Sequence, residues 1–114
     1  MPNVSIFVSA LSLLLGSVHG VVMRGPITPV SRVGTPNEAP ATHLELVFSR
    51  TTTQKRIRVS TDAHGRYRIR LRAGTYTVST SQQPKIGRGL DPDIVRIRAG
   101  RDSRVNFHLD TGIR

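Results

Sequence analysis

Arginine is the side chain with the most capacity for chemistry in this sequence. Of the 17 basic residues in the 114-residue chain, 15 are Arg, and only seven residues are acidic, so the formal net charge is +10. Many arginines occupy every second position of short runs, with apolar residues between them, so their side chains are predicted to point away from a core. Eight residues show this pattern: Arg56, Arg58, Arg66, Arg68, Arg70, Arg72, Arg96 and Arg98.

If these runs are neighbouring strands, the eight arginines form one basic face. Such a face attracts polyanions, for example nucleic acid, anionic lipid or an acidic wall polymer. Sheets that bind nucleic acid normally place aromatic rings among the basic residues. Here the aromatics beyond the N-terminal segment are all predicted to face the core, which favours a face that is merely solvated. These aromatics are Phe48, Tyr67, Tyr76 and Phe107. Any nucleic-acid binding by the arginines would not depend on base sequence.

Other site chemistry is not visible in the pattern. The chain has no Cys, which excludes disulfides, Cys-ligated metals and a Cys nucleophile. His43 and Glu45 share one side of a predicted strand, and Asp62 and His64 share a turn. Each pair is too small a ligand set for a metal ion, which needs three or four convergent ligands. The sequence therefore predicts no catalytic residues, no cofactor-binding or metal site and no enzyme activity.

The elements that would carry the arginines are strands. Between residues 43 and 109, apolar residues alternate with polar ones in six short runs, the pattern of strands with one dry and one wet face. The runs cover residues 43–48, 56–60, 66–72, 75–79, 95–98 and 104–109. With a further strand near residues 21–23, they predict an all-β, seven-stranded antiparallel sandwich.

The N-terminal segment is predicted to be separate from the sandwich. Residues 1–23 carry no Lys, Arg, Asp or Glu, and the apolar run 6–15 has the length of a signal-peptide core. We predict a signal peptide or hydrophobic anchor at 1–20, cleaved after Gly20 in the first case, and a β-sandwich domain at 21–114. An uncleaved segment 4–23 could also anchor the chain in a membrane, and a misplaced start codon is a third interpretation. The predicted location is secreted or cell surface, with membrane anchoring as the second choice.

Residues 61–78 follow the pattern T-D-x-x-G-x-Y-x-I-x-L-x-x-G-x-Y-x-V. This pattern resembles the signature of carboxypeptidase regulatory-like domains, which are prealbumin-like (transthyretin-like) seven-stranded β-sandwiches, here preceded by the hydrophobic segment. We expect the Asp to accept hydrogen bonds from N–H groups two and three residues further on, the first Gly to adopt a positive φ, the second to allow a reversal and the tyrosines to pack inside. The residues that carry the motif are Thr61, Asp62, Gly65, Tyr67, Gly74 and Tyr76.

The resemblance extends to a bacterial exported branch of this family, which carries a Cys pair in its first long loop. Thr28 and Asn37 stand at the positions of that pair. Prealbumin-like folds also include the hydroxyisourate hydrolases, which end in Tyr-Arg-Gly-Ser. This chain ends Thr111-Gly112-Ile113-Arg114, so that activity is disfavoured.

The resemblance and the residues together predict a non-catalytic exported module with a structural or binding role at the cell surface. Its partner would be an unknown protein or a cell-wall component. The alternative is a polyanion-binding protein that uses the arginine face. Exposed edge strands would also allow a dimer through edge pairing.

Overall fold

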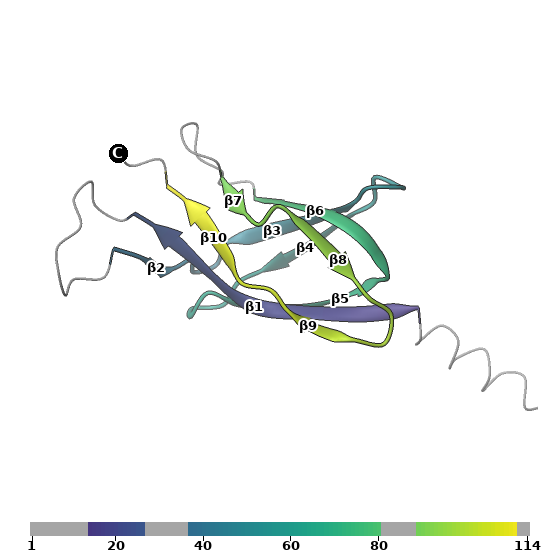
Figure 1. Ribbon diagram of the computed structural model, residues 1–114. Coiled ribbons are helices and arrows are strands. Elements are labelled where there is room, and N and C mark those ends of the chain that lie inside the picture. Colours follow the sequence, from purple (N-terminus) through teal and green to yellow (C-terminus); the bar gives the residue numbers. More distant parts are fainter. Residues whose placement is uncertain (1–13, 27–36, 81–88, 112–114) are drawn as a thin grey trace, which may run out of the picture.

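The computed structural model describes residues 14–26, 37–80 and 89–111, which form strands and turns (Figure 1). The predicted all-β fold is confirmed. The strands are β1 (Leu15–Gly25), β2 (Ala39–Pro40), β3 (Glu45–Arg50), β4 (Arg56–Ser60), β5 (Arg66–Arg72), β6 (Gly74–Thr80), β7 (Leu90–Asp91), β8 (Ile94–Ile97), β9 (Asp102–Arg104) and β10 (Phe107–Asp110). The described residues contain no helix long and apolar enough to cross a membrane.

The strands form two sheets that pack face to face. One sheet has the order β4-β3-β6-β8 and is antiparallel throughout. The other has the order β2-β1-β10-β7, and β5 and β9 also pair with β1. Strand β1 is therefore the central strand of the second sheet, and Figure 1 shows it running along nearly the whole length of the sandwich.

Strand β1 has different partners along its two halves. Residues 15–21 pair antiparallel with β5, and residues 17–19 pair parallel with β9 on the other side. Residues 22–25 pair parallel with β10, and Met23 and Arg24 pair antiparallel with β2. The structure thus corrects two predictions. The first strand begins at Leu15 rather than near residue 21, and the sandwich is not antiparallel throughout, because the chain crosses from β8 to the other sheet and returns alongside β1.

The predicted boundary between residues 20 and 21 falls inside β1. The apolar residues 1–13 and Thr28 lie outside the described residues, so the signal peptide or anchor stays a prediction. The two buried glycines of the first half of β1 have a structural role. A Cβ atom would lie 2.2 Å from Arg98 O at Gly16 and 2.0 Å from Val105 O at Gly20, so only Gly allows the crossing backbone to approach this closely.

The strand predicted over residues 104–109 is divided into β9 and β10. Both keep one register against β1, with Ser17 opposite Asp102 and Val22 opposite Phe107. At the break, Asn106 Oδ1 accepts a hydrogen bond from the Val21 N–H at 3.0 Å. A side chain thus replaces one backbone partner, and pairing resumes beyond it.

The aromatic side chains join the two sheets, as predicted. Phe48, Tyr67, Tyr76 and Phe107 are each at most 4% exposed. Phe48 of β3 lies 6.3 Å, centroid to centroid, from both Tyr67 of β5 and Phe107 of β10, and the last two rings are 5.5 Å apart. Such ring pairs add stabilisation beyond their area of apolar burial. This cluster confirms the register predicted from the alternation.

The turn motif before β5 is a hydrogen-bonded unit. The buried Thr61 Oγ1 accepts a hydrogen bond from the Leu44 N–H at 2.8 Å. Asp62 Oδ1 accepts bonds from the N–H groups of His64 and Arg66 at 2.8 and 2.9 Å. The acceptor pattern is therefore two and four residues on, not two and three, because the Gly65 N–H binds Asp62 O instead.

The later residues of the motif behave as predicted. Gly65 has φ +75° and Gly74 has φ +153°. Tyr67 Oη donates to Val105 O, and Tyr76 Oη donates to Arg72 O at 2.7 Å. Burial raises the pKa of both tyrosines. The motif therefore fixes both ends of β5, and with them the positions of its four arginines.

Candidate functional site

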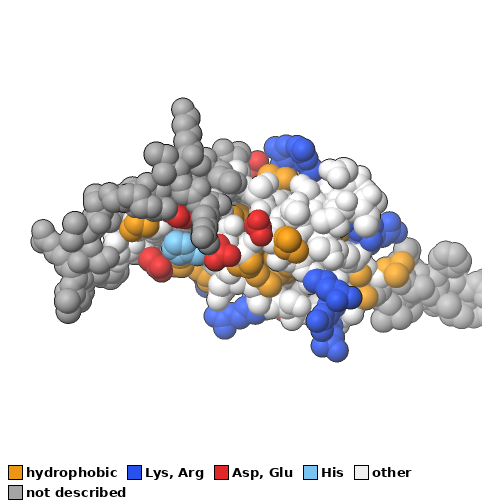
Figure 2. All heavy atoms as spheres, turned by 45° about the horizontal axis from the view of Figure 1, so that its top comes forward, with side chains coloured by type: hydrophobic (Ala, Val, Ile, Leu, Met, Phe, Trp, Pro, Cys, Tyr) orange, Lys and Arg blue, Asp and Glu red, His pale blue; other side chains and the backbone are white. Residues whose placement is uncertain are grey.

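The eight predicted arginines are all exposed but do not form one face. Arg56 and Arg58 lie on β4, and Arg96 and Arg98 lie in or next to β8, at the two opposite edges of the four-stranded sheet. The other four lie on β5 in the second sheet. The predicted single plate is thus corrected by the strand order, which alternation along the chain does not reveal. The face seen in Figure 2 likewise shows separate basic patches near its rim.

The four arginines of β5 form one row on the outer face of the second sheet. In the pairing with β1, Arg72 lies opposite Leu15, Arg70 opposite Ser17, Arg68 opposite His19 and Arg66 opposite Val21. On the other side of β1, β9 places Asp102 beside Ser17 and Arg104 beside His19. Three strands thus bring six polar or charged outward side chains together around residues 17–19 of β1. We call these the outer-face cluster: Ser17, His19, Arg68, Arg70, Asp102 and Arg104.

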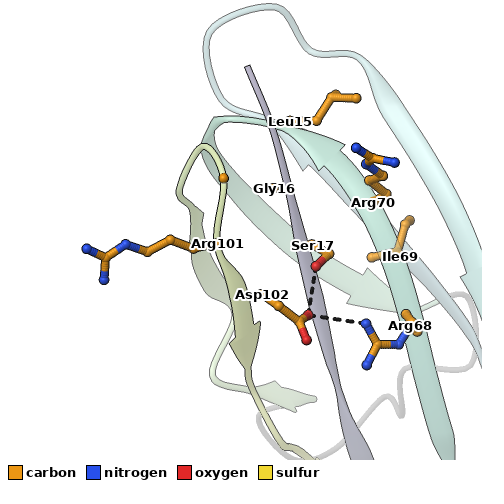
Figure 3. A pocket seen from close by; sticks show the side chains of 9 residues that line it. Leu15, Gly16, Ser17, Arg68, Ile69, Arg70, Arg101 and Asp102 are labelled. Atoms are coloured by element: carbon orange, nitrogen blue, oxygen red, sulfur yellow. Dashed lines mark hydrogen bonds and ion pairs between the residues drawn. The ribbon is translucent and has the colours of Figure 1, made fainter. Parts of the chain in front are cut away.

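Asp102 is the hub of the outer-face cluster (Figure 3). Its Oδ1 accepts a hydrogen bond from Ser17 Oγ at 2.7 Å and lies 3.1 Å from His19 Nδ1 and 3.3 Å from Arg68 NH1. The Ser17 hydrogen bond, followed by that of His19, lowers the pKa of the Asp102 carboxyl, and desolvation opposes this effect. Asp102 is therefore a carboxylate at neutral pH, with donors from two other strands around one oxygen.

This arrangement is poorly suited to nucleophilic catalysis. A serine nucleophile needs a hydrogen-bonded base that is able to take its proton near neutral pH. Ser17 instead donates to a carboxylate whose pKa is lowered, and the same carboxylate oxygen separates Ser17 from His19. The geometry organises a surface rather than activating a hydroxyl.

Two shallow grooves flank the outer-face cluster. One, of about 600 Å³, is lined by residues that include Ser17, Arg68, Arg70 and Asp102. In Figure 3 the Arg68 side chain turns toward Asp102, whereas Arg101 points away from it. The other, of about 500 Å³, is lined by residues that include His19, Arg66 and Arg104. Within the row, Arg66 and Arg68 pair with Asp62 and Asp102 at 3.4 and 3.3 Å.

Metal binding gains no support from the described part of the chain, which contains no group of three His, Asp or Glu side chains placed to hold an ion. Glu45 pairs with Arg58 at 3.3 Å, and Asp62 is occupied by its turn. Ser17 and His19 were not predicted as site residues because they fall within residues 1–20, the predicted signal peptide or hydrophobic anchor. Their alternation with Gly16, Val18 and Gly20 is the signal that could have found them.

Comparison with solved structures finds the same fold in bacterial proteins of low sequence identity. The minor pilin GBS52 of Streptococcus agalactiae is 15% identical, with a TM-score of 0.59 over 86% of this chain and 45% of the pilin chain. PA1324 of Pseudomonas aeruginosa, for which carbohydrate binding has been suggested, is 10% identical, with a TM-score of 0.55 over 88% of this chain and 93% of that one. A leucine-rich repeat protein of Bacteroides thetaiotaomicron matches over 12% of its length, with 13% identity and a TM-score of 0.51.

These similarities show a β-sandwich of the immunoglobulin-like or prealbumin-like kind and nothing narrower. The chain spans less than half of the pilin and about an eighth of the leucine-rich repeat protein. No family model matches the chain, and no curated protein matches its sequence.

Proposed function

We propose that this chain is an exported, non-catalytic β-sandwich module with a structural or binding role at the cell surface. The observation that carries the proposal is the arrangement around Asp102, where Ser17, His19 and Arg68 all contact one carboxylate of lowered pKa. That arrangement orders a surface and leaves Ser17 without an effective base. The fold shared with a minor pilin and with PA1324 supports the same conclusion.

Membership in the carboxypeptidase regulatory-like family is part of this proposal. The support is the motif from Thr61 to Tyr76, in which each residue has the contact that its type suggests: a buried Thr, an Asp in a turn, two Gly at positive φ and two buried Tyr. The disfavoured alternative, a hydroxyisourate-hydrolase-like enzyme, predicts turnover of hydroxyisourate by the purified chain. We expect no turnover above the uncatalysed rate.

Location and N-terminus test the export proposal together. The full chain, with a C-terminal tag, is expressed in its native host, the cells are fractionated, and the N-terminus of the recovered protein is determined by mass spectrometry. We expect the protein in the secreted or envelope fraction, with any cleavage before Leu15, because β1 begins there. Recovery of the intact chain only from the cytoplasm would contradict export.

Polyanion binding through the row on β5 is the second candidate. It is favoured by Arg70 and Arg72, which make no ion pair with the described acidic residues, next to Arg66 and Arg68 on the same face. The test is elution from a heparin column. We expect the double variant Arg68→Gln/Arg70→Gln to elute at lower salt than the wild type, and the control Arg56→Gln/Arg96→Gln, which removes the same charge from the other sheet, to change less. Equal changes would indicate an effect of net charge alone.

A further inference from the structure

A third cleft lies between the β3–β4 hairpin and the C-terminal end of β5, away from the Asp102 hub. Its volume is about 360 Å³, which is within the range of small-molecule sites. Nine described residues line it, of which four are cationic and none is acidic. The cationic residues are Arg50, Lys55, Arg70 and Arg72. Four positive charges with no acid in the lining create a local potential that attracts anions.

Arg50 is the fixed cation of this cleft. It ends β3 opposite Tyr76, and its backbone closes the hairpin through bonds to Lys55 O at 2.9 Å and from the Gln54 N–H at 2.8 Å. Its guanidinium donates to Ala73 O at 2.9 Å and packs against Gly74, where a Cβ atom would lie 2.9 Å from Nε. The side chain therefore has little freedom to turn toward solvent.

The guanidinium of Arg50 is incompletely paired. Its Nε is buried and has no hydrogen-bond partner among the described residues. A buried N–H donor without a partner is unfavourable, because the cost of removing it from water is not offset by a hydrogen bond. Arg50 and Arg72 also act electrostatically on the Tyr76 hydroxyl, which places both positive charges close to the same ring. An anion in the cleft would place a negative charge beside these two cations.

The other three cations are available to a ligand. Lys55, Arg70 and Arg72 are exposed, and none of them forms an ion pair with a described acidic residue. In contrast, Arg66 and Arg68, in the first half of β5, each form an ion pair with an aspartate. Ion pairing with aspartates along β5 therefore ends at Arg68, and the next two arginines, Arg70 and Arg72, line the cleft.

The remaining walls suit a small carbon skeleton. Ile57, Leu71, Leu15 and the ring of Tyr76 line the cleft beside the cations. The Tyr76 ring is held in place by its hydrogen bond to Arg72 O. Apolar surface next to clustered guanidinium and ammonium groups is the lining expected for an organic acid.

We propose that this cleft binds the oxyanion group of a small organic molecule, as a carboxylate, sulfate or phosphate. The site is discrete and enclosed on several sides, unlike the open row on β5 that would attract a polymer. The proposal does not depend on the module's location or on heparin binding, although Arg70 and Arg72 belong to both surfaces.

The test is a titration of the isotope-labelled full chain, followed by nuclear magnetic resonance. Sodium sulfate, sodium phosphate and sodium glucuronate are added at constant ionic strength, with sodium chloride as the reference. We expect saturable shifts at Gly74, Tyr76 and Ile57 with at least one of the three anions, and the tightest of them identifies the group. Shifts that do not saturate, or that chloride reproduces, would overturn the proposal.

Variants separate this cleft from a general charge effect. Lys55→Gln/Arg72→Gln should weaken anion binding about tenfold or more, since it removes two charge-assisted contacts. The control Arg96→Gln/Arg104→Gln, which removes equal charge outside the cleft, should change it by less than about twofold. If the double variant does not fold, Lys55→Gln alone, at an exposed side chain, should still weaken binding several-fold. Equal loss in the control would contradict the site.

Discussion

The two halves of β1 have the same inner face and different outer faces. Val18 in the first half and Val22 in the second are both 0% exposed, so each contributes equally to the core. On the outside, the first half lies between the arginines of β5 and the Asp102 hub. The second half lies between β2 and β10, whose neighbourhood carries acidic groups, including Glu38 paired with His108 at 3.4 Å. One strand thus supports two surfaces of different charge on a continuous core.

The difference between the two outer faces also explains why the sequence of the first half of β1 resembles part of a signal peptide. A central strand flanked on both sides by charged strands presents small or uncharged side chains, here Ser17 and His19, between its neighbours. Its inner face is apolar, and its glycines admit the crossing chain. An uncharged run with small residues is therefore compatible with a central strand as well as with a signal peptide.

Truncation should have the largest effect on the molecule. Removal of residues 1–20 takes away six of the seven residue pairs between β1 and β5, all three pairs with β9, and Val18 from the core. We expect residues 21–114 not to fold cooperatively, because β5 would keep only the Val21–Arg66 pair with β1, the one strand that it pairs with among the described residues. Residues 14–114, the matched control, should fold. Circular dichroism and urea unfolding measure both, and a cooperative transition in the shorter chain would refute the role given to the first half.

Much of the fold was predictable because the signals are local. The alternation of apolar and polar residues marks β3, β4, β5, β6 and β8, and the Thr61–Tyr76 motif marks the turns around β5. The aromatic cluster follows from the same alternation. These features depend on residues that are close in sequence, so one sequence suffices to recognise them.

The pairing of strands was not predictable in the same way. Whether Arg56 and Arg68 share a face depends on strand order, and the order places β4 and β5 in different sheets. Asp102 became a hub because it meets Ser17 across 85 residues of sequence. The break of the last strand at Asn106 also depends on a distant partner, the Val21 N–H. Contacts of this range leave no periodic signal, so the candidate site was only partly foreseen.

The second-largest effect is expected from glycine substitutions, which should lower the free energy of unfolding more in the first half of β1 than in the second. Gly20→Ala places a Cβ atom 2.0 Å from Val105 O, a backbone atom held by the sheet, and should destabilise the fold by about 3 kcal/mol. Gly25→Ala, in the second half, meets the backbone Asn37 O at 2.8 Å, which lies before β2 rather than within a strand, and should cost less, about 1 kcal/mol. Urea unfolding gives both values. Equal costs would mean that the crossing at Gly20 is looser than the structure has it.

On the inner face, which the two halves of β1 share, substitutions are expected to have equal effects. Val18→Ala and Val22→Ala each remove two methyl groups from a fully buried position and should each cost about 2 kcal/mol. The measurement is again the free energy of unfolding, and the similarity of the two values is the test. A cost at Val18 of less than half that at Val22 would show that the first half is not an equal part of the core.

The smallest effect is expected at Asp102, and it depends on pH. Because the folded-state pKa of this carboxyl is lowered, its contribution to stability is present above the unfolded pKa of about 3.9 and is lost as the pH falls through the lower folded value. Asp102→Asn should therefore lower the urea midpoint at pH 7, and the difference from the wild type should shrink as the pH falls through the folded-state pKa and the wild-type carboxyl becomes protonated.

Asp93→Asn is the control for this prediction, since Asp93 is exposed, has no ion pair among the described residues and lies outside the outer-face cluster. It should leave the midpoint nearly unchanged over the same pH range, because removing an isolated surface charge costs little. If Asp102→Asn behaved like Asp93→Asn at pH 7, the hydrogen bonds from Ser17 and His19 would not stabilise the fold. The outer face of the first half would then be held mainly by its backbone pairing with β5 and β9.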